Sequence, residues 1–399
     1  MRILFTTLPV ETHLRPLVSV AEAALARGHE VAVCAPESFR DEVELYGLRL
    51  LPSGKDWVTE MLAPLFEAES IPPEQVTTLM SRLVSEGLPG DGALEMAHDV
   101  IRHVNSFSAD VIVREAYEMG GYLAGEVTNI PHISIGVVGR VTEFLDKALL
   151  GPPLNRHRET LGLAPDPSTE RLYAHLHAHF MPPGYDPEEL SIPTLRCYRH
   201  HTVDRPGDSL PRSIGRLDPS LPLVYASLGT VAPLFRAADE RLRAIIEGLG
   251  RVECEAVVAV GQGGPDLSTT RVAANVHVVD TIAQPLLLDT VDLLVTHSGF
   301  TSVRESLRAG VPMVAVPWIA ENHIIARRCA ELGVARLLDW ETLDSETVAQ
   351  ACAAALADPE PRARARAIQR EMLTLGSVDT LVTDIEELVT KTSSEGGLR

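Results

Sequence analysis

Residues 295–305, VTHSGFTSVRE, connect an apolar strand to the start of a helix through a turn that contains glycine. The apolar run ends at Thr296, and helical spacing begins near Thr301. In an open parallel sheet, ligands bind at the carboxyl ends of the strands. The free N–H groups and the positive dipole end of a helix start attract anions at that place. The segment therefore predicts an anion site, or else a plain strand–turn–helix in which His297 only caps the turn.

The side chains of this turn suit a nucleotide. Gly299 lets an oxyanion approach the backbone, and His297 can donate a hydrogen bond to a phosphate oxygen. Glu305 follows in the helix, where its carboxylate can accept hydrogen bonds from ribose hydroxyls. We expect these three residues to contact a sugar nucleotide if the turn is a binding site.

The same strand–helix alternation extends through the chain on both sides of the turn. Residues 2–7 and 31–35 are apolar runs that flank an amphipathic helix at 13–27, which predicts a parallel βαβ unit. Further strands are predicted at 49–51, 111–114, 132–135, 223–227, 256–260, 276–278, 292–296 and 313–316. The other predicted helices are 94–104, 121–126, 237–248, 301–308, 320–331, 345–357, 361–375 and 378–391. The fold class is α/β.

The chain divides into two α/β domains. Residues 206–221 are rich in Pro, Gly, Asp and Ser and show no hydrophobic period, which indicates a linker. We therefore predict an N-terminal domain at 1–205 and a C-terminal domain at 222–377. The last helix and tail, 378–399, are followed by no strand, so they either stay with the second domain or pack back on the first.

Composition excludes several classes of protein. The 399 residues include 35 basic and 55 acidic ones, a net charge of −20, which disfavours nucleic acids and anionic membranes as partners. The five cysteines are scattered without a CxxC pair, which indicates reduced thiols. No apolar run approaches the ~20 residues that span a bilayer, and no signal peptide is evident. We expect a cytoplasmic protein without stable membrane insertion, and a homodimer is left open.

Four segments in a fixed order resemble family-1 glycosyltransferases of the GT-B fold. They are THLRPL (12–17), YASLGTV (225–231), VVDTIAQPLLL (278–288) and the signature at 295–322. The signature contains the family pattern H-x-G-x-x-S-x-x-E, then GVP at 310–312 and the pair Glu321-Asn322. The resemblance implies two Rossmann-like, doubly wound domains that face each other across a cleft. It favours the bacterial, UGT-like type that acts on macrolides and polyketides.

The family's functional residues can be carried over to this chain. His13 would be the general base, and Glu115, where relatives usually have Asp, would orient it. The donor-binding residues implied by the resemblance are Ser227, Gly229, Thr230, Thr281, Ile282, Gln284, His297, Ser298, Gly299, Thr301, Ser302, Glu305, Glu321 and Asn322. The lipophilic acceptor would contact apolar residues of the first domain, namely Trp57, Met61, Leu65, Phe66 and Met80, which core packing explains about as well.

The chain departs from the family pattern at three places. Ser298 follows the motif histidine where glycine is usual, and Thr281 stands where many relatives stack a tryptophan on the base. Glu321-Asn322 replaces the usual Asp-Gln pair that contacts the sugar, which moves one methylene from one side chain to the other. We expect these positions to bear on the choice of base and sugar.

No metal or cofactor is predicted. His175, His177 and His179 alternate, but no cysteine or carboxylate nearby completes a first shell of ligands. The chain contains no Asp-x-Asp pair for Mg²⁺, and neither a P-loop nor GxGxxG follows the first strand.

We therefore expect an inverting, metal-independent O-glycosyltransferase of the hexosyltransferase type. A TDP-deoxysugar is the first choice of donor and UDP-glucose the second, with a natural-product aglycone as acceptor. The alternatives are a sugar-nucleotide epimerase of the same fold and a catalytically silent auxiliary subunit.

Overall fold

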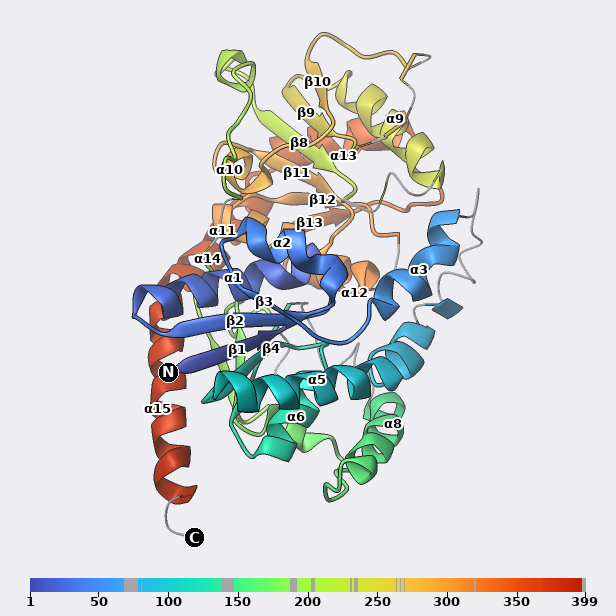
Figure 1. Ribbon diagram of the computed structural model, residues 1–399. Coiled ribbons are helices and arrows are strands. Elements are labelled where there is room, and N and C mark those ends of the chain that lie inside the picture. The colour runs from blue at the N-terminus through green and yellow to red at the C-terminus, as the bar shows by residue number, and fades with distance from the viewer. Residues whose placement is uncertain are drawn as a thin grey trace. The chain divides into compact units, whose positions relative to one another are not determined.

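The computed structural model describes all residues except 68–77, 80, 138–146, 187–191, 202–204, 230, 231, 233–235, 263, 266, 269, 319, 320 and 397–399. The chain forms two compact units. The first comprises Met1–Ala63, Thr78–Pro206 and Thr374–Arg399, and the second has Gly207–Leu373 as its main part. Each unit is built around one sheet with helices on it (Figure 1). Among the described residues, no helix is long and apolar enough to cross a membrane.

The sheet of the first unit is parallel throughout, in the order β3-β2-β1-β4-β5-β6-β7. Its strands are β1 (Arg2–Thr6), β2 (Glu30–Ala35), β3 (Leu50–Pro52), β4 (Val111–Glu115), β5 (His132–Ile135), β6 (Leu176–His179) and β7 (Leu195–Cys197). Strands covered on both faces read as continuous apolar runs. The β1 residues Ile3, Leu4 and Phe5 are accordingly all fully buried.

The sheet of the second unit is also parallel, in the order β10-β9-β8-β11-β12-β13. Its strands are β8 (Leu223–Ser227), β9 (Glu255–Ala259), β10 (Val276–Val279), β11 (Leu293–Thr296), β12 (Met313–Ala315) and β13 (Ala335–Leu337). In both sheets the strand order reverses direction beside the first strand of the unit. This is the Rossmann-like, doubly wound arrangement that the sequence predicts.

Helices connect the strands. In the first unit they are α1 (Glu11–Ala26), α2 (Arg40–Leu45), α3 (Trp57–Glu67), α5 (Asp91–Phe107), α6 (Gly120–Thr128), α8 (Lys147–Thr160) and α15 (Val378–Gly396), with short turns η1 (Glu37–Phe39), η2 (Leu83–Gly87) and η3 (Glu170–Tyr173). In the second they are α9 (Arg236–Leu249), α10 (Gln284–Leu288), α11 (Phe300–Ala309), α12 (Asn322–Glu331), α13 (Ser345–Ala357) and α14 (Pro359–Thr374), and η4 (Ile214–Arg216) precedes β8.

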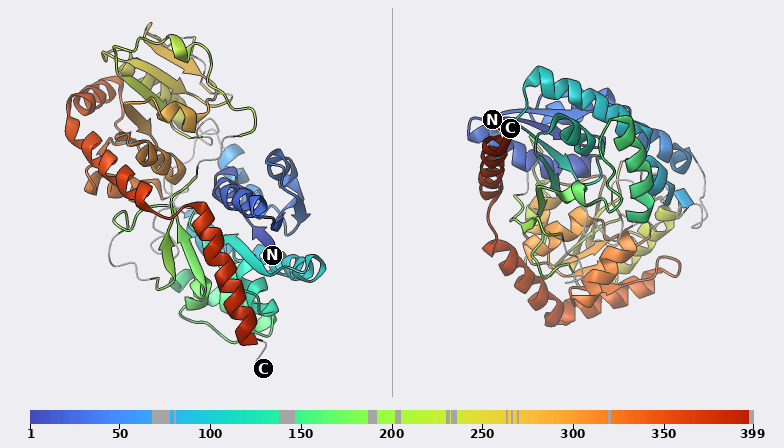
Figure 2. Two further views of the ribbon diagram at one scale, coloured as in Figure 1. Left: turned by 90° about the vertical axis from the view of Figure 1, so that its left-hand side faces the viewer. Right: turned by 90° about the horizontal axis from the view of Figure 1, so that it is seen from below.

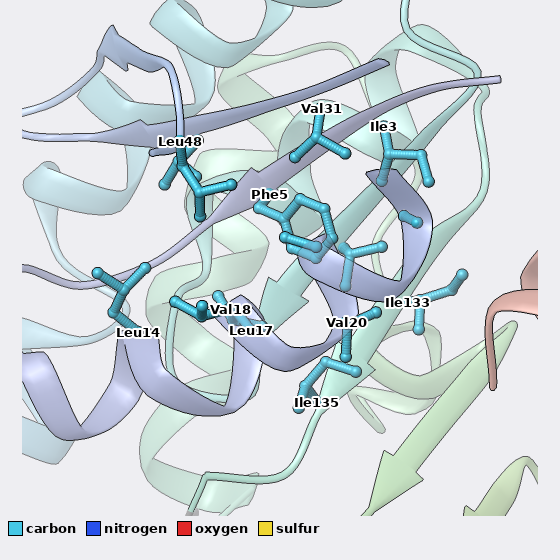
Figure 3. Close-up of a cluster of buried hydrophobic side chains, with 14 of the residues drawn as sticks. Ile3, Phe5, Leu14, Leu17, Val18, Val20, Val31, Leu48, Ile133 and Ile135 are labelled. Atoms are coloured by element: carbon cyan, nitrogen blue, oxygen red, sulfur yellow. The ribbon is translucent and has the colours of Figure 1, made fainter. Parts of the chain in front are cut away.

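One core cluster of the first unit lies between its sheet and the helices α1 and α15. Side chains at helical spacing on α1, such as Leu14, Leu17 and Val18, meet alternate residues of the strands, such as Phe5 and Ile133 (Figure 3). All five are 1 % exposed or less. This packing fixes where α1 begins relative to the end of β1.

The C-terminal helix α15 packs on the first unit. Its residues Leu381, Val382 and Ile385 are fully buried in the same core as α1, and the helix runs along that unit in Figure 2. The carboxylate of Glu386 accepts hydrogen bonds from Arg27 and lies 2.8 Å from Nε2 of His29. The apolar stripe of the helix therefore finds its partner far away in the sequence.

Three strands of the described residues were absent from the sequence prediction: β6, β7 and β13. They have three or four residues each, and their letters, LHAH, LRC and ARL, include charged or polar side chains. The runs LRC and ARL are too short to show a strand period, and LHAH alternates apolar and polar residues over only four positions. They become strands because a neighbouring strand supplies hydrogen-bond partners, as in the pairing of His177 with Leu195.

A group of histidines lies inside the first unit. His132 and His177 are 1 % and 2 % exposed, and the ring of His132 packs edge-on against that of His175 at 4.8 Å. Burial lowers the pKa of His132 to about 4, opposed by the contact with Glu126, and also lowers the pKa values of His175 and His177. These imidazoles are therefore neutral in the folded protein at neutral pH.

This burial predicts loss of stability in mild acid. In the unfolded chain these histidines take up protons with a pKa of 6.5, whereas folded His132 takes one up only near a pKa of about 4. The contribution to stability is therefore complete above pH 6.5 and is lost as the pH falls from 6.5 to about 4. The contribution of His132 alone is about 3 kcal/mol at most. Urea midpoints should be lower at pH 5 than at pH 7, and His132→Gln should reduce that difference. The exposed His98, changed to Gln, is the control and should leave it unaltered.

Candidate functional site

His13 and Glu115 meet at the carboxyl edge of the first sheet. His13 lies in the first turn of α1, just after β1, and Glu115 is the last residue of the adjacent parallel strand β4. Nδ1 of His13 is 3.2 Å from Oε1 of Glu115. The His13 side chain is 16 % exposed and that of Glu115 is 0 %. The imidazole is therefore partly open to solvent, whereas the carboxylate is enclosed.

The loop after β4 holds the carboxylate from its other side. The backbone N–H of Tyr117 donates to Oε2 of Glu115 at 2.7 Å. The ring of Tyr117 also lies against the His13 imidazole, with centroids 5.8 Å apart. A carboxylate on Nδ1 favours a proton at that nitrogen and leaves Nε2 to accept one. A pair of this kind can act as a general base with a carboxylate that orients it.

Two further charged residues, one in the loop and one in β4, were missed by the sequence analysis. Glu118 is buried and accepts hydrogen bonds from the Thr6 hydroxyl and from the backbone N–H groups of Gly120 and Gly121. Burial raises the pKa of Glu118. Arg114 is fully buried at the end of β4. A signal was available, because a charged residue inside the run VIVRE is unusual for a strand covered on both faces.

The predicted acceptor residues are described only in part. Trp57 packs so closely on two glycines that a Cβ at Gly87 or Gly92 would lie 2.7 or 2.3 Å from the indole, and Met61 also contacts Gly87. Trp57 forms one wall of a small pocket that is lined in addition by Thr7, Leu8, Pro9, Pro36, Ser53, Gly54, Lys55, Leu88, Gly92, Ala93, Met96, Glu118 and Met119. The side chains of Leu65 and Phe66, and all of Met80, lie outside the described residues.

In the second unit, His297 is enclosed by two glycines. It follows β11, which pairs with β8 so that Thr296 lies beside Ser227. A Cβ on Gly229 would approach Cε1 of His297 to 2.6 Å, and a Cβ on Gly299 would approach Nε2 to 2.5 Å. Gly229 also has a φ of +89°, which other residues rarely adopt. Both glycines are therefore needed for the imidazole to lie where it does.

His297 is a neutral hydrogen-bonding group in this setting. Burial lowers its pKa to about 4, and a hydrogen bond with the backbone of Ser227 opposes part of that effect. Next to it, α11 begins at Phe300 with Gly299 as its N-cap, so the N–H groups of Thr301 and Ser302 fall in its open first turn. Ser227 and Gly229 lie beside this turn, whereas Thr230 lies outside the described residues. Together these groups can bind an anion.

Ser298 occupies a left-handed backbone conformation, with a φ of +68°. Only glycine adopts this region without cost, which explains why glycine is usual at this position in the family. Its side chain is 1 % exposed, and Oγ has no hydrogen-bond partner among the described residues. The serine therefore adds strain to the turn without an evident contact that offsets it.

Gln284, Ser302 and Glu305 form a second cluster of predicted donor residues. The Gln284 amide donates to Oε2 of Glu305 at 2.7 Å and lies 3.4 Å from the Ser302 hydroxyl. Glu305 is 2 % exposed. Gln284 is the first residue of α10, whereas Thr281 in the preceding loop is exposed and Ile282 partly so. The contact holds the Glu305 carboxylate in one orientation on α11, beside the turn of residues 297–299, which we call the anion-binding turn.

Glu321 and Asn322 lie at the start of α12, which follows β12, the neighbour of β11. Asn322 is 4 % exposed, and its Oδ1 has no hydrogen-bond partner among the described residues. The structure thus places these two residues at the same edge of the sheet as His297 and α11. A ligand on the turn would extend along that edge.

The alternating histidines contact neighbouring side chains of the first unit. His177 faces Ser134, with Nδ1 3.1 Å from Oγ, and its ring packs on Tyr173 and His179. Within the described part of the chain, no group of three or more His, Cys, Asp or Glu side chains has a geometry that could hold a metal ion.

Known proteins resemble the chain in sequence and in fold. Residues 243–388 match the family described as "Erythromycin biosynthesis protein CIII-like, C-terminal domain". The chain is 26 % identical to 4'-demethylrebeccamycin synthase of Lentzea aerocolonigenes, with 97 % of this chain and 99 % of that protein covered. It is 24 % identical to TDP-daunosamine transferase DnrS of Streptomyces peucetius over 100 % and 99 % of the two chains. The crystal structure of glycosyltransferase VinC in complex with dTDP superimposes with a TM-score of 0.78 at 22 % identity, covering 98 % and 100 %.

The two parallel sheets and the histidine-bearing turn, with these likenesses, define a glycosyltransferase of the GT-B fold. More narrowly, the chain resembles the family-1 glycosyltransferases of natural-product biosynthesis, as its family match and its curated relatives indicate. The predictions of fold, family and enzyme class are therefore confirmed.

The strain at Ser298 yields a prediction. Ser298→Gly removes a side chain from a left-handed position and a buried hydroxyl without a partner, so it should stabilise the second unit by about 1 kcal/mol. Ser302→Gly, in the helical part of the same segment, is the matched control and should destabilise it by a similar amount. Chemical denaturation of both variants checks this. A loss of stability in Ser298→Gly would mean that the hydroxyl has a favourable contact.

Proposed function

We propose that the protein is an inverting O-glycosyltransferase that works without a metal. Its donor is a TDP-deoxysugar, with UDP-glucose as the second choice, and its acceptor is a hydroxyl of a lipophilic natural-product aglycone. The observation that carries this proposal is the contact of 3.2 Å between His13 Nδ1 and Glu115 Oε1 with the imidazole still partly exposed. A base that is oriented but accessible is what an acceptor hydroxyl needs.

The second unit would bind the donor. Its anion-binding turn, with His297 and the first N–H groups of α11, would hold the diphosphate. The carboxylate of Glu305 would accept from the ribose hydroxyls, and Glu321 and Asn322 would bind the sugar. Ser227 and Gly229 complete the phosphate side. The preorganised donors stabilise the charge that develops on the leaving diphosphate.

The first unit would supply the base. Nε2 of His13 takes the proton of the acceptor hydroxyl while that oxygen bonds to the anomeric carbon, and the bond from this carbon to the diphosphate oxygen breaks. Attack from the face opposite the diphosphate gives one inversion. Glu115 stabilises the imidazolium that forms, and the nucleoside diphosphate leaves with the negative charge.

The relatives support the choice of substrates. One is named a TDP-daunosamine transferase, another a 4'-demethylrebeccamycin synthase, and VinC was crystallised with dTDP. These names are consistent with sugar transfer from a nucleotide to an antibiotic-type acceptor. The sequence has no Asp-x-Asp pair, which supports diphosphate binding by hydrogen bonds alone. Transfer should then persist in EDTA.

Transfer should depend on His13. We expect His13→Ala to abolish glycoside formation when the purified protein is given TDP- and UDP-sugars with a panel of aglycones, because no other group would take the proton. Product mass and nucleotide release are the measurements. His98→Ala, at an exposed position, is the control and should retain activity.

Other outcomes of the same assay count against the proposal. An epimerised donor in the absence of acceptor would show a sugar-nucleotide epimerase. Nucleotide binding without turnover of any acceptor would indicate an auxiliary subunit. Full activity of His13→Ala would remove the histidine from the mechanism.

Donor binding should depend on His297. His297→Ala should weaken the binding of thymidine diphosphate by roughly 1–3 kcal/mol, because a hydrogen bond to a charged oxygen is lost. Isothermal calorimetry measures this directly. His277→Ala is the control, since His277 lies in β10 of the same unit and contacts Glu255 at 2.8 Å instead. Equal affinity of His297→Ala and wild type would contradict the assignment.

A further inference from the structure

Arg114 donates all of its described hydrogen bonds to backbone carbonyls. Nη1 donates to the carbonyl of Ala116 at 3.0 Å and to those of Glu115 and Glu118 at 3.4 Å. Nη2 donates to the carbonyl of Leu172, in η3, at 2.5 Å. The guanidinium carbon also lies 5.9 Å from the centroid of the Tyr173 ring. One side chain thus ties the loop after β4 to η3.

The contacted loop is the one that carries Glu115. Its chain turns sharply, with the Glu118 N–H donating to the Glu115 carbonyl at 3.2 Å. The Tyr117 N–H, which lies between the carbonyls that Arg114 binds, is the group that holds Oε2 of Glu115. A change in the path of this loop therefore moves the Glu115 carboxylate relative to the imidazole of His13.

Burying the charged side chain of Arg114 costs free energy, which its contacts must offset. The side chain is fully buried, and burial lowers its pKa, opposed by Tyr173, Glu118, Glu115 and Tyr122. No described carboxylate lies within ion-pairing distance of the guanidinium. The buried His132 and His177 also face it, and its charge lowers their pKa values in addition to burial. An apolar residue at this position would avoid the cost of burying a charge. It could not donate hydrogen bonds to the four carbonyls, as the planar guanidinium does.

We propose that Arg114 is a positioning residue that holds Glu115 against His13 by fixing the backbone of residues 115–118. The inference rests on the proposed function, in which His13 is the base and Glu115 orients it. Arg114 itself is fully buried, so it acts through the backbone of this loop. Its effect on His13 passes through the Glu115 carboxylate, which selects the tautomer with the proton on Nδ1.

The tautomer of His13 is a readout that a merely structural role would not change. A free imidazole exchanges between the two neutral tautomers, and an acceptor at Nδ1 favours one of them. Nitrogen-15 NMR of protein labelled at the histidine rings, at a pH where the imidazole is neutral, distinguishes protonated from unprotonated ring nitrogens. His13→Asn identifies the signals by removing them. The experiment needs no substrate, so its result is separate from that of the transfer assay.

We expect Arg114→Lys to shift His13 from the Nδ1–H tautomer towards the mixture seen in Glu115→Ala, although the positive charge is retained. Lysine has a single ammonium group and cannot bind the four carbonyls together. Arg158→Lys is the matched control. Arg158 is 2 % exposed in the same unit but donates to Tyr122, Glu126 and the Ala164 carbonyl, so this variant should leave the tautomer as in wild type.

The opposite results would overturn the proposal. A wild-type tautomer in folded Arg114→Lys, with a shifted one in Glu115→Ala, would show that Glu115 keeps its place without Arg114. A wild-type tautomer in Glu115→Ala would show that the contact with Glu115 does not determine the tautomer of His13. The proposal would then be wrong. If Arg114→Lys does not fold, Tyr173→Leu replaces it, because this change removes the ring under the guanidinium and leaves the arginine. The same shift is then expected, and its absence overturns the inference.

Discussion

Parallel strand pairing is the constraint on which both units depend. A chain that pairs all its strands in parallel must cross back, after each one, to the end of the sheet where the strands begin, and the connection is usually a helix. All carboxyl ends then lie at one edge, where helix starts offer free N–H groups. His13 and Glu115 meet because β1 and β4 are neighbours, and Ser227 meets the anion-binding turn because β8 and β11 are neighbours. The places of these four residues or segments follow from this geometry.

Close packing then sets the chemistry at each edge. In the second unit, two glycines leave room for one imidazole, and enclosure keeps that imidazole neutral. In the first unit, the carboxylate of Glu115 is fully buried, whereas the ring of His13 beside it is 16 % exposed. The two histidines therefore differ in surroundings. His297 is enclosed in the second unit, whereas the His13 side chain in the first unit is 16 % exposed.

Local signals explain why the anion-binding turn could be predicted and other parts could not. One continuous strand–turn–helix contains His297, Gly299 and Glu305, and its local sequence is enough to predict it. The contact of Gln284 with Glu305 joins two helices, and the strand β6 needs β5 and β7 beside it. No short window of sequence contains such partners. The burial of Arg114 was signalled only by a charge in an apolar strand, without any indication of what it binds.

The sequence by itself determined the α/β class, the order of most strands and helices, and the identity of His13, His297 and Glu305 as candidate residues. The periods of apolar residues and the glycine-containing turn are local properties that do not depend on distant segments. Tertiary structure alone decided that α15 packs on the first unit, that Ser298 takes a left-handed backbone, and that Arg114 binds the loop of Glu115. Each of these depends on contacts between segments far apart in the chain, which are established only when the sheets and their helices pack together.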